Sequence, residues 1–280
     1  MPRNEKMKTN HRVILRFTVL AATALVACAG AQAANTCSLS SNGFSSAYVP
    51  TNPGTNITPA SFTMTCTPNV AGPTSQTYTV SINNGLNNNN AASGANKISY
   101  DLYTDSTCVT LWKNKTLGGT INLGAQGVPV SQTVPFWGCI PAGQILVPAG
   151  TFTDTVTMNP SIGNTTQFPV SIVTPSSCTI TTPPGNINFN YVGFQTTPAS
   201  TSSNFAATCT NNLPYSLALD ATSGILSGLT YTLSLSAPSG VGNGLSQLYK
   251  VDGLMAPGQS GDCATGVCSG RQARTLTITY

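Results

Sequence analysis

The chain has 280 residues, of which only 6% are charged, and a formal net charge of +4 at pH 7. All of that excess lies in the first 16 residues, which also hold the only His and the only Glu; the remainder carries six basic and six acidic residues. The net charge of +4 therefore gives no indication of nucleic-acid binding, which requires a clustered basic surface, and we expect no nucleic-acid partner. Without His or Glu, the usual catalytic triads and His-bearing metal sites are also excluded, so we expect neither an enzyme nor a cofactor.

Residues 1–33 have the features of a secretory signal peptide. Five basic residues precede the apolar run FTVLAATALVACAG, and Ala31-Gln32-Ala33 forms a cleavage signature before Ala34. The stretch from Leu25 to Cys28 also resembles a bacterial lipoprotein box, which would leave a lipid on Cys28. Either route predicts an exported chain, and both alternatives remain open.

Eight cysteines follow the signal peptide, and an even number in an exported chain predicts disulfide bonds. They are Cys37, Cys66, Cys108, Cys139, Cys178, Cys209, Cys263 and Cys268. The first two are 29 residues apart and Cys178 and Cys209 are 31 apart, which makes each of these a predicted pair. By elimination Cys108 then pairs with Cys139, and Cys263 with Cys268.

An internal repeat accompanies this spacing. Taken in chain order, SFTMTCT, QTYTVSINNG and QTVPFWGCIPAGQ in the first half correspond to SNFAATCT, LPYSLALDATSG and QLYKVDGLMAPGQ in the second. Several motifs in the same order indicate a duplication. We therefore predict one domain over residues 34–175 and another over residues 176–280.

Nearly every segment has the alternating pattern of a β-strand, with β-branched residues between clusters of Gly, Pro, Asn and Ser. No long stretch has the spacing of a helix. The predicted fold class is all-β, with two tandem immunoglobulin-like antiparallel sandwiches. The last segment, RQARTLTITY, alternates Leu276, Ile278 and Tyr280 with Thr, so it reads as a strand that needs neighbours on both edges.

Four motifs resemble the spore coat protein U domain, the fold of the archaic, Csu-type chaperone-usher pilins. They are ISYDLYTDSTCVTLW, the Gly-Gln of PAGQ, AGTFTDTVTM and YSLALDATSG. Two departures stand out: Lys113 replaces the Gly that usually follows Trp in the family, and RQARTLTITY stands where the last strand of the family usually carries Tyr and Asp. The resemblance nevertheless covers most of both halves.

The resemblance implies that each sandwich lacks its final strand, which the N-terminal extension of the next subunit supplies by donor-strand complementation. Leu276, Ile278 and Tyr280 would then line a groove in the second domain. A periplasmic chaperone would fill this groove before delivery to the outer-membrane usher, and a rod pilin donor strand would fill it afterwards. The alternative is an ordinary edge strand protected by the first domain.

The first domain is expected to complete itself, because FPVSIVTP places Phe168, Val170 and Ile172 in alternation after the strand TFTDTVTM. Mature Ala34-Asn35-Thr36 is too short to be a donor strand. The resemblance then implies a two-domain tip adhesin on the cell surface, acting in attachment and biofilm formation. Alternatives are a non-adhesive pilus or coat subunit, or a surface lipoprotein if Cys28 is lipidated.

Contact with varied surfaces requires apolar side chains at loop tips, because removing apolar area from water drives such contact. The candidates in the first domain are Tyr48, Val49, Val70, Leu86, Leu111 and Trp112, within or beside the loop segments YVP, TPNVAGPTS, GLNNNN and VTLW, with Phe136 and Trp137 as further possibilities. For each of them the alternative is packing in the core. The surface or receptor that they would contact is not encoded in any motif.

Overall fold

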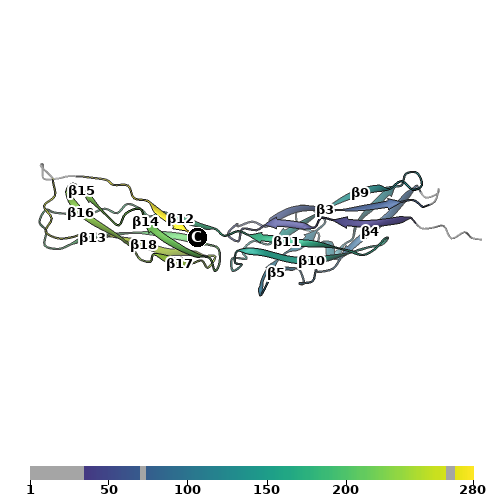
Figure 1. The fold of residues 1–280 in the computed structure, drawn as a ribbon, viewed down its shortest axis with the longest axis horizontal. Coiled ribbons are helices and arrows are strands. Elements are labelled where there is room, and N and C mark those ends of the chain that lie inside the picture. The colour runs from purple at the N-terminus through teal and green to yellow at the C-terminus, as the bar shows by residue number, and fades with distance from the viewer. Residues whose placement is uncertain (1–34, 70–73, 263–268) are drawn as a thin grey trace, which may run out of the picture. The chain divides into compact units, whose positions relative to one another are not determined.

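A computed structural model describes residues 35–69, 74–262 and 269–280 (Figure 1). These residues form nineteen β-strands and a single 3-10 turn, η1 (Trp112–Asn114). None of the helices in the described part of the chain is long and apolar enough to cross a membrane. The all-β fold class is therefore confirmed, and the strands form two sandwiches, each with its own hydrophobic core.

The first sandwich contains β1 (Thr36–Ser41), β2 (Phe44–Ala47), β3 (Asn56–Thr67), β4 (Ser75–Ile82), β5 (Asn90–Ser93), β6 (Asn96–Ser99), β7 (Asp101–Tyr103), β8 (Leu117–Asn122), β9 (Val130–Ile140), β10 (Gly150–Pro160) and β11 (Thr166–Thr174). One sheet has the order β1-β3-β9-β7 and the other β2-β11-β10-β4-β8, with the hairpin β5-β6 attached to β10.

Aromatic rings fill the core of the first sandwich. The Trp112 ring lies 5.5 Å from that of Phe62 and 4.9 Å from that of Phe136, which in turn lies 5.6 Å from Phe168. All four side chains are almost completely buried. Because they come from η1, β3, β9 and β11, this cluster joins both sheets.

The second sandwich contains β12 (Cys178–Thr182), β13 (Ala199–Cys209), β14 (Pro214–Leu219), β15 (Ser223–Leu226), β16 (Leu229–Leu235), β17 (Ser239–Val241), β18 (Ser246–Met255) and β19 (Leu276–Thr279). Its sheets have the orders β12-β13-β18-β16-β15 and β17-β14-β19. The core is smaller than that of the first sandwich and includes Phe205, Tyr215, Leu217 and Val251. The predicted domain boundary, between residues 175 and 176, falls between β11 and β12.

Three disulfides lie within the described residues: Cys37–Cys66, Cys108–Cys139 and Cys178–Cys209. The first and third join equivalent strand pairs, β1 to β3 and β12 to β13, at directly opposed positions. All three are the pairs predicted from the sequence. The fourth predicted pair, Cys263 and Cys268, lies outside the described residues.

Candidate functional site: the unpaired edge of β19

Strand β19 has a neighbour on one edge only among the described residues. It pairs antiparallel with β14, with Ile278 opposite Leu217 and Leu276 opposite Leu219. Leu276 and Ile278 are half-buried and pack against the core of the second sandwich, whereas Tyr280 is 56% exposed. The other edge of β19 therefore presents unpaired backbone N–H and C=O groups, as any free strand edge does.

The position of β19 in the duplicated fold follows from two tyrosines. Tyr100 donates its hydroxyl hydrogen to Asp154 Oδ2 at 2.8 Å in the first sandwich, and Tyr231 donates to Gln272 Oε1 at 2.6 Å in the second. Gln272 thus occupies the place of Asp154, and the segment from 270 to 279 occupies the place of β10. At this position the last segment therefore has Gln where β10 has Asp.

In the first sandwich, β11 covers the edge that is open in the second. It pairs antiparallel with β10 over nine positions, from Gly150 opposite Thr174 to Met158 opposite Thr166. Its other edge pairs in parallel with β2. Phe168, Val170 and Ile172 alternate along it and are almost completely buried, so their side chains close the core between the two sheets.

The second sandwich has no described strand in the place of β11, and parts of the segments that would flank such a strand are irregular. The segment from 270 to 275 has no strand pairing, although the corresponding part of β10 is regular strand. Ile187 and Phe189 lie against Gly253 as Phe44 lies against Gly138, yet the segment from 187 to 190 is not a strand whereas β2 is one.

The side chains of the 270–279 segment are also less buried than those of β10. In β10 the inward-facing Asp154, Val156 and Met158 are buried, while their counterparts Gln272, Arg274 and Leu276 are exposed or half-buried. Arg274 donates from Nε to the hydroxyl of Tyr231 at 2.9 Å. Between the segments 187–190 and 270–279 the second sandwich therefore has no described strand, whereas β11 pairs with the corresponding strands β2 and β10 in the first sandwich.

The two Gln residues of the repeated motif hold equivalent loops in both sandwiches. Gln144 accepts from the N–H of Ser99 at 2.8 Å and donates to its carbonyl at 3.0 Å. Gln259 makes the same two bonds to Thr230, at 2.6 and 3.0 Å. The sequence revealed that these Gln residues coincide in the repeat but not what they bind.

A tyrosine hydroxyl makes two further hydrogen bonds to the loop that carries each of these Gln residues. The Tyr48 hydroxyl donates to the carbonyl of Pro141 at 3.2 Å and accepts from the N–H of Gln144 at 3.1 Å. Tyr191 does the same with Ala256 and Gln259, both at 2.9 Å. Tyr191 was not singled out from the sequence, although its counterpart Tyr48 was.

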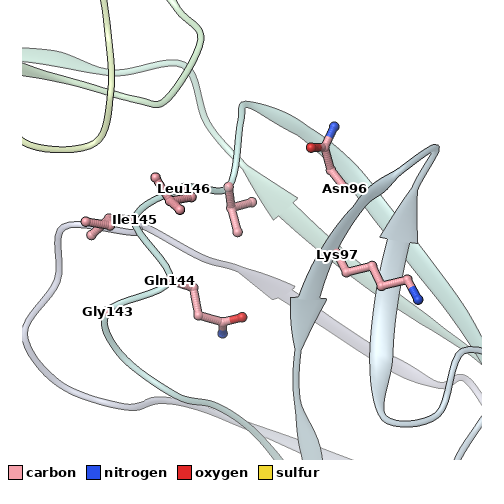
Figure 2. A pocket seen from close by; sticks show the side chains of 7 residues that line it. Asn96, Lys97, Gly143, Gln144, Ile145 and Leu146 are labelled. Atoms are coloured by element: carbon pink, nitrogen blue, oxygen red, sulfur yellow. The ribbon is translucent and has the colours of Figure 1, made fainter.

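A cavity of about 370 Å³ lies beside Gln144 in the first sandwich. Figure 2 shows Asn96 and Lys97 of the β5-β6 hairpin on one side and the loop from Gly143 to Leu146 on the other. The Gln144 amide is already bonded to backbone, and the same amide arrangement recurs at Gln259, so it serves the fold. The described residues contain no group of three or more His, Cys, Asp or Glu that would hold a metal ion.

The prediction that Tyr48 and Trp112 are adhesive is wrong. Tyr48 and Trp112 are almost completely buried: the former holds the Gln144 loop, and the latter packs among aromatic rings while its indole N–H donates to the Val80 carbonyl at 3.0 Å. Neither side chain reaches solvent. Phe136 is likewise in the core, and Trp137 is half-buried.

The other adhesive candidates lie nearer the surface. Leu86 is 73% exposed in the loop between β4 and β5, and Val109, from the candidate segment VTLW, is 76% exposed. Val49 and Leu111 are half-buried, and Val70 lies outside the described residues. The loop that carries Val109 is ordered by Asp105, which accepts from Thr107 and Thr110 and has its pKa lowered by those hydrogen bonds.

Lys113, the other departure from the family pattern, has a structural role. Its ammonium group lies 2.8 Å from Asp101 Oδ1, which also accepts from the side-chain amide of Asn89. Both charged side chains are partly buried. The ion pair therefore fixes η1 to the start of β7 rather than forming a binding site.

The family model of the Spore Coat Protein U domain matches residues 22–159 and 164–246. Because these two segments make up well over half of the chain, the chain belongs to the spore coat protein U domain family. None of the curated proteins matches the chain.

Two solved structures are similar over most of their length. One is the CupB6 tip adhesin from Pseudomonas aeruginosa, with 11% identity, 87% of this chain and 94% of that chain covered, and a TM-score of 0.34. The other is a chaperone-tip adhesin complex of CFA/I fimbriae biogenesis, with 10% identity, 85% and 96% covered, and a TM-score of 0.28. Similarity at this level does not define what the chain binds.

Proposed function

We propose that this protein is the tip adhesin subunit of an archaic chaperone-usher pilus, exported through the periplasm to the cell surface. The observation that carries the proposal is the difference between β10 and β19. The first has β4 on one edge and β11 on the other, whereas β19 has β14 and an open edge among the described residues. Membership of the spore coat protein U domain family supports it further.

The missing strand is proposed to come from the N-terminal extension of a rod pilin. By the register of β11, it would run antiparallel to the 270–279 segment and parallel to residues 187–190, converting both into regular strand pairs. Its alternate residues would be apolar, as Phe168, Val170 and Ile172 are in β11. A periplasmic chaperone would fill the same groove before the outer-membrane usher exchanges it for the pilin strand.

The domains over residues 34–175 and 176–280 would divide the work between adhesion and connection. Cleavage after Ala33 would leave three residues before Cys37, too few for a donor strand, which supports a place at the tip. Leu86 and Val109 are the proposed adhesive side chains, because they are large, apolar and solvent-exposed. Transferring them from water onto an apolar surface supplies the driving force for attachment and biofilm formation.

Hydrogen exchange tests the connection. The tagged full chain is purified from pili of the cells that make it and compared with the chain purified alone. We expect the amides of residues 187–190 and 270–279 to exchange slowly in the pilus and quickly in the free chain. Equal exchange in both states, or slow exchange in the free monomer, would contradict the donor-strand connection.

Attachment of cells tests the adhesive role. The double variant Leu86→Asn and Val109→Asn should reduce attachment to a hydrophobic surface while the number of pili stays the same. Leu248→Asn is the matched control, because Leu248 is 82% exposed on β18 of the second sandwich. Unchanged attachment by the double variant, with antibody labelling along the whole pilus, would favour the non-adhesive structural subunit.

Mass spectrometry of the full chain purified from pili tests where the signal peptide is cleaved. We expect a mature chain that begins at Ala34. A lipid-modified Cys28 at the N-terminus would instead identify a surface lipoprotein.

A further inference from the structure

The turn Val192–Gln195 in the second sandwich holds two large apolar side chains in solvent. Val192 is 72% exposed and Phe194 is 71% exposed. Phe194 also has a φ of 59°, in the left-handed region that glycine adopts freely and bulky residues rarely do. A residue that combines an unfavourable backbone conformation with an exposed aromatic ring indicates a functional constraint.

The turn is fixed to the sandwich by hydrogen bonds. The N–H of Phe194 donates to the carbonyl of Gln259 at 2.8 Å, and the N–H of Gly258 donates to the carbonyl of Gln195, also at 2.8 Å. The Gln195 side chain accepts from the N–H of Val192 at 3.0 Å. The loop that contains Gln259 and the turn Val192–Gln195 are thus held together by hydrogen bonds, which keep the ring of Phe194 in a preorganised position.

The repeat supplies a comparison for this turn. Tyr48 and Tyr191 occupy equivalent places, and each is followed by a turn closed by one backbone bond: Asn52 to Val49 in the first sandwich, Gln195 to Val192 in the second, both at 3.0 Å. Thr51 stands where the second sandwich has Phe194, and its φ is not positive. The fold therefore does not require an aromatic residue there.

The first sandwich also indicates what comes close to this turn. The N–H of Tyr48 donates to the carbonyl of Val173, so β11 reaches its end directly beside the start of the Val49–Asn52 turn. Only residues 175–177 then separate β11 from β12 and a new sandwich. A strand that filled the second groove in the same register would end beside Tyr191, and the body of its own polypeptide would begin a few residues later.

We propose that Val192 and Phe194 form an apolar docking contact with the sandwich of the subunit that donates the strand to the β19 edge. This inference rests on the proposed function and deepens it, because it adds a second contact beyond the strand itself. Strand and docking contact belong to one polypeptide, so binding at one raises the effective concentration at the other. The turn would thereby stiffen the joint between the tip subunit and the rod.

Site-specific photo-crosslinking tests the contact in the intact pilus. A photoreactive phenylalanine is placed in the full chain at Phe194, at Ile278 in the groove, or at Leu248 as the exposed control, and the crosslinked peptides are identified by mass spectrometry. We expect positions 194 and 278 to crosslink to the same pilin, 278 to its N-terminal extension and 194 to its globular part, and 248 to give no crosslink to it.

The outcomes separate the two proposals. Crosslinking from 278 without crosslinking from 194 would overturn the docking contact and leave the donor strand intact. No pilin crosslink from 278 would overturn the proposed function, and the docking contact with it. Crosslinking from 194 to a different protein would also contradict the docking contact.

A second variant measures what the contact contributes. Phe194→Asn keeps a residue that tolerates the left-handed conformation and removes the ring, so the isolated chain should remain as stable as before. We expect roughly tenfold less of this variant to stay in pili at a denaturant concentration that half-releases the unaltered chain, as the loss of one buried aromatic contact predicts. Leu248→Asn should be retained normally; equal retention of both variants would contradict the proposal.

Discussion

Tyr191 accepts a hydrogen bond from the N–H of Gln259 at 2.9 Å, and this bond joins the loop after β18 to the loop before β13. The Gln259 side chain at the same point holds both backbone groups of Thr230. One short motif, PGQ in this half and AGQ in the first, therefore joins two loops and the end of a strand, Thr230 of β16 here and Ser99 of β6 in the first sandwich. The contribution of the Gln259 amide to stability can be measured by substituting Gln259 alone, because its partners are backbone groups that the substitution leaves unchanged.

Gln259→Met should lower the free energy of unfolding of the second sandwich by about 1–2 kcal/mol, because it removes the two hydrogen bonds between the Gln259 amide and the backbone of the exposed Thr230. Urea unfolding followed by hydrogen exchange of β16 measures this. Gln167→Met is the control: its amide makes an exposed bond to Thr157, and we expect a change within about 0.5 kcal/mol. If the two substitutions change the free energy of unfolding equally, the hydrogen bonds between Gln259 and Thr230 make no special contribution to stability.

Phe168→Ala should lower the free energy of unfolding of the first sandwich by about 3–5 kcal/mol, because the ring is buried in the aromatic cluster. Val173→Ala lies on the same strand but faces outwards, with 42% exposure, and should cost far less. Denaturant titration of both variants makes the comparison. Similar losses would indicate that β11 contributes its backbone ladder rather than its side chains.

A copy of Thr166–Thr174 fused through a flexible linker after Tyr280 should raise the unfolding temperature of the second sandwich, because it offers the groove an apolar strand in cis. Each kcal/mol gained corresponds to about 4–8 °C in a domain of this size. Calorimetry measures the shift. A fused strand with Ser in place of Phe168, Val170 and Ile172 is the control and should give no shift; a rise with that control would mean that the linker alone stabilises the domain.

Alkaline pH should destabilise the first sandwich. Burial and then the hydrogen bond to Asp154 raise the pKa of Tyr100 well above its ordinary value of 10.0. A folded-state pKa above the unfolded one gives a contribution that is complete below pH 10.0 and is lost as the pH rises beyond it. Urea midpoints measured from about pH 8 to about pH 11 should fall on the alkaline side.

Tyr100→Phe provides the control for this pH dependence. The variant lacks the ionisable hydroxyl, so its midpoint should start lower and then fall less steeply above pH 10.0. Parallel profiles for the two proteins would assign the alkaline loss to other groups.

The strand pattern, the three described disulfides and the burial of Phe168, Val170 and Ile172 could be predicted because alternation and Cys spacing are local signals. For Tyr48 and Trp112 the sequence left exposure and core packing as alternatives, because an aromatic residue beside a turn has the same local pattern whether its ring points into the core or out of it. Only the tertiary contacts with Pro141 and Val80 decide this. Val49 lies beside Tyr48 in the same segment, YVP, and has the same local pattern, yet it is half-buried whereas Tyr48 is buried.

The groove illustrates a different limit. Leu276, Ile278 and Tyr280 were predicted to lie on one face of a strand running from Arg271 to Tyr280. Leu276 and Ile278 do pack against the core, but Tyr280 is 56% exposed, and the exposed stretch from 270 to 275 is not a strand. Its residues, Gln272 and Arg274 among them, do not alternate between apolar and polar types. Their equivalence to Asp154 and Val156 emerges only from the tyrosine bonds in space.

The ladder between β10 and β11 has a mechanical consequence. β11 is held on both edges, by β10 over nine positions and by β2 over four, and its hydrogen bonds lie across the strand axis. Tension that enters through Thr174 acts along that axis and loads these bonds together in shear, rather than opening them one after another. The link between the two sandwiches is thus anchored to resist pulling, as a subunit that connects a cell to a surface in flowing liquid would require.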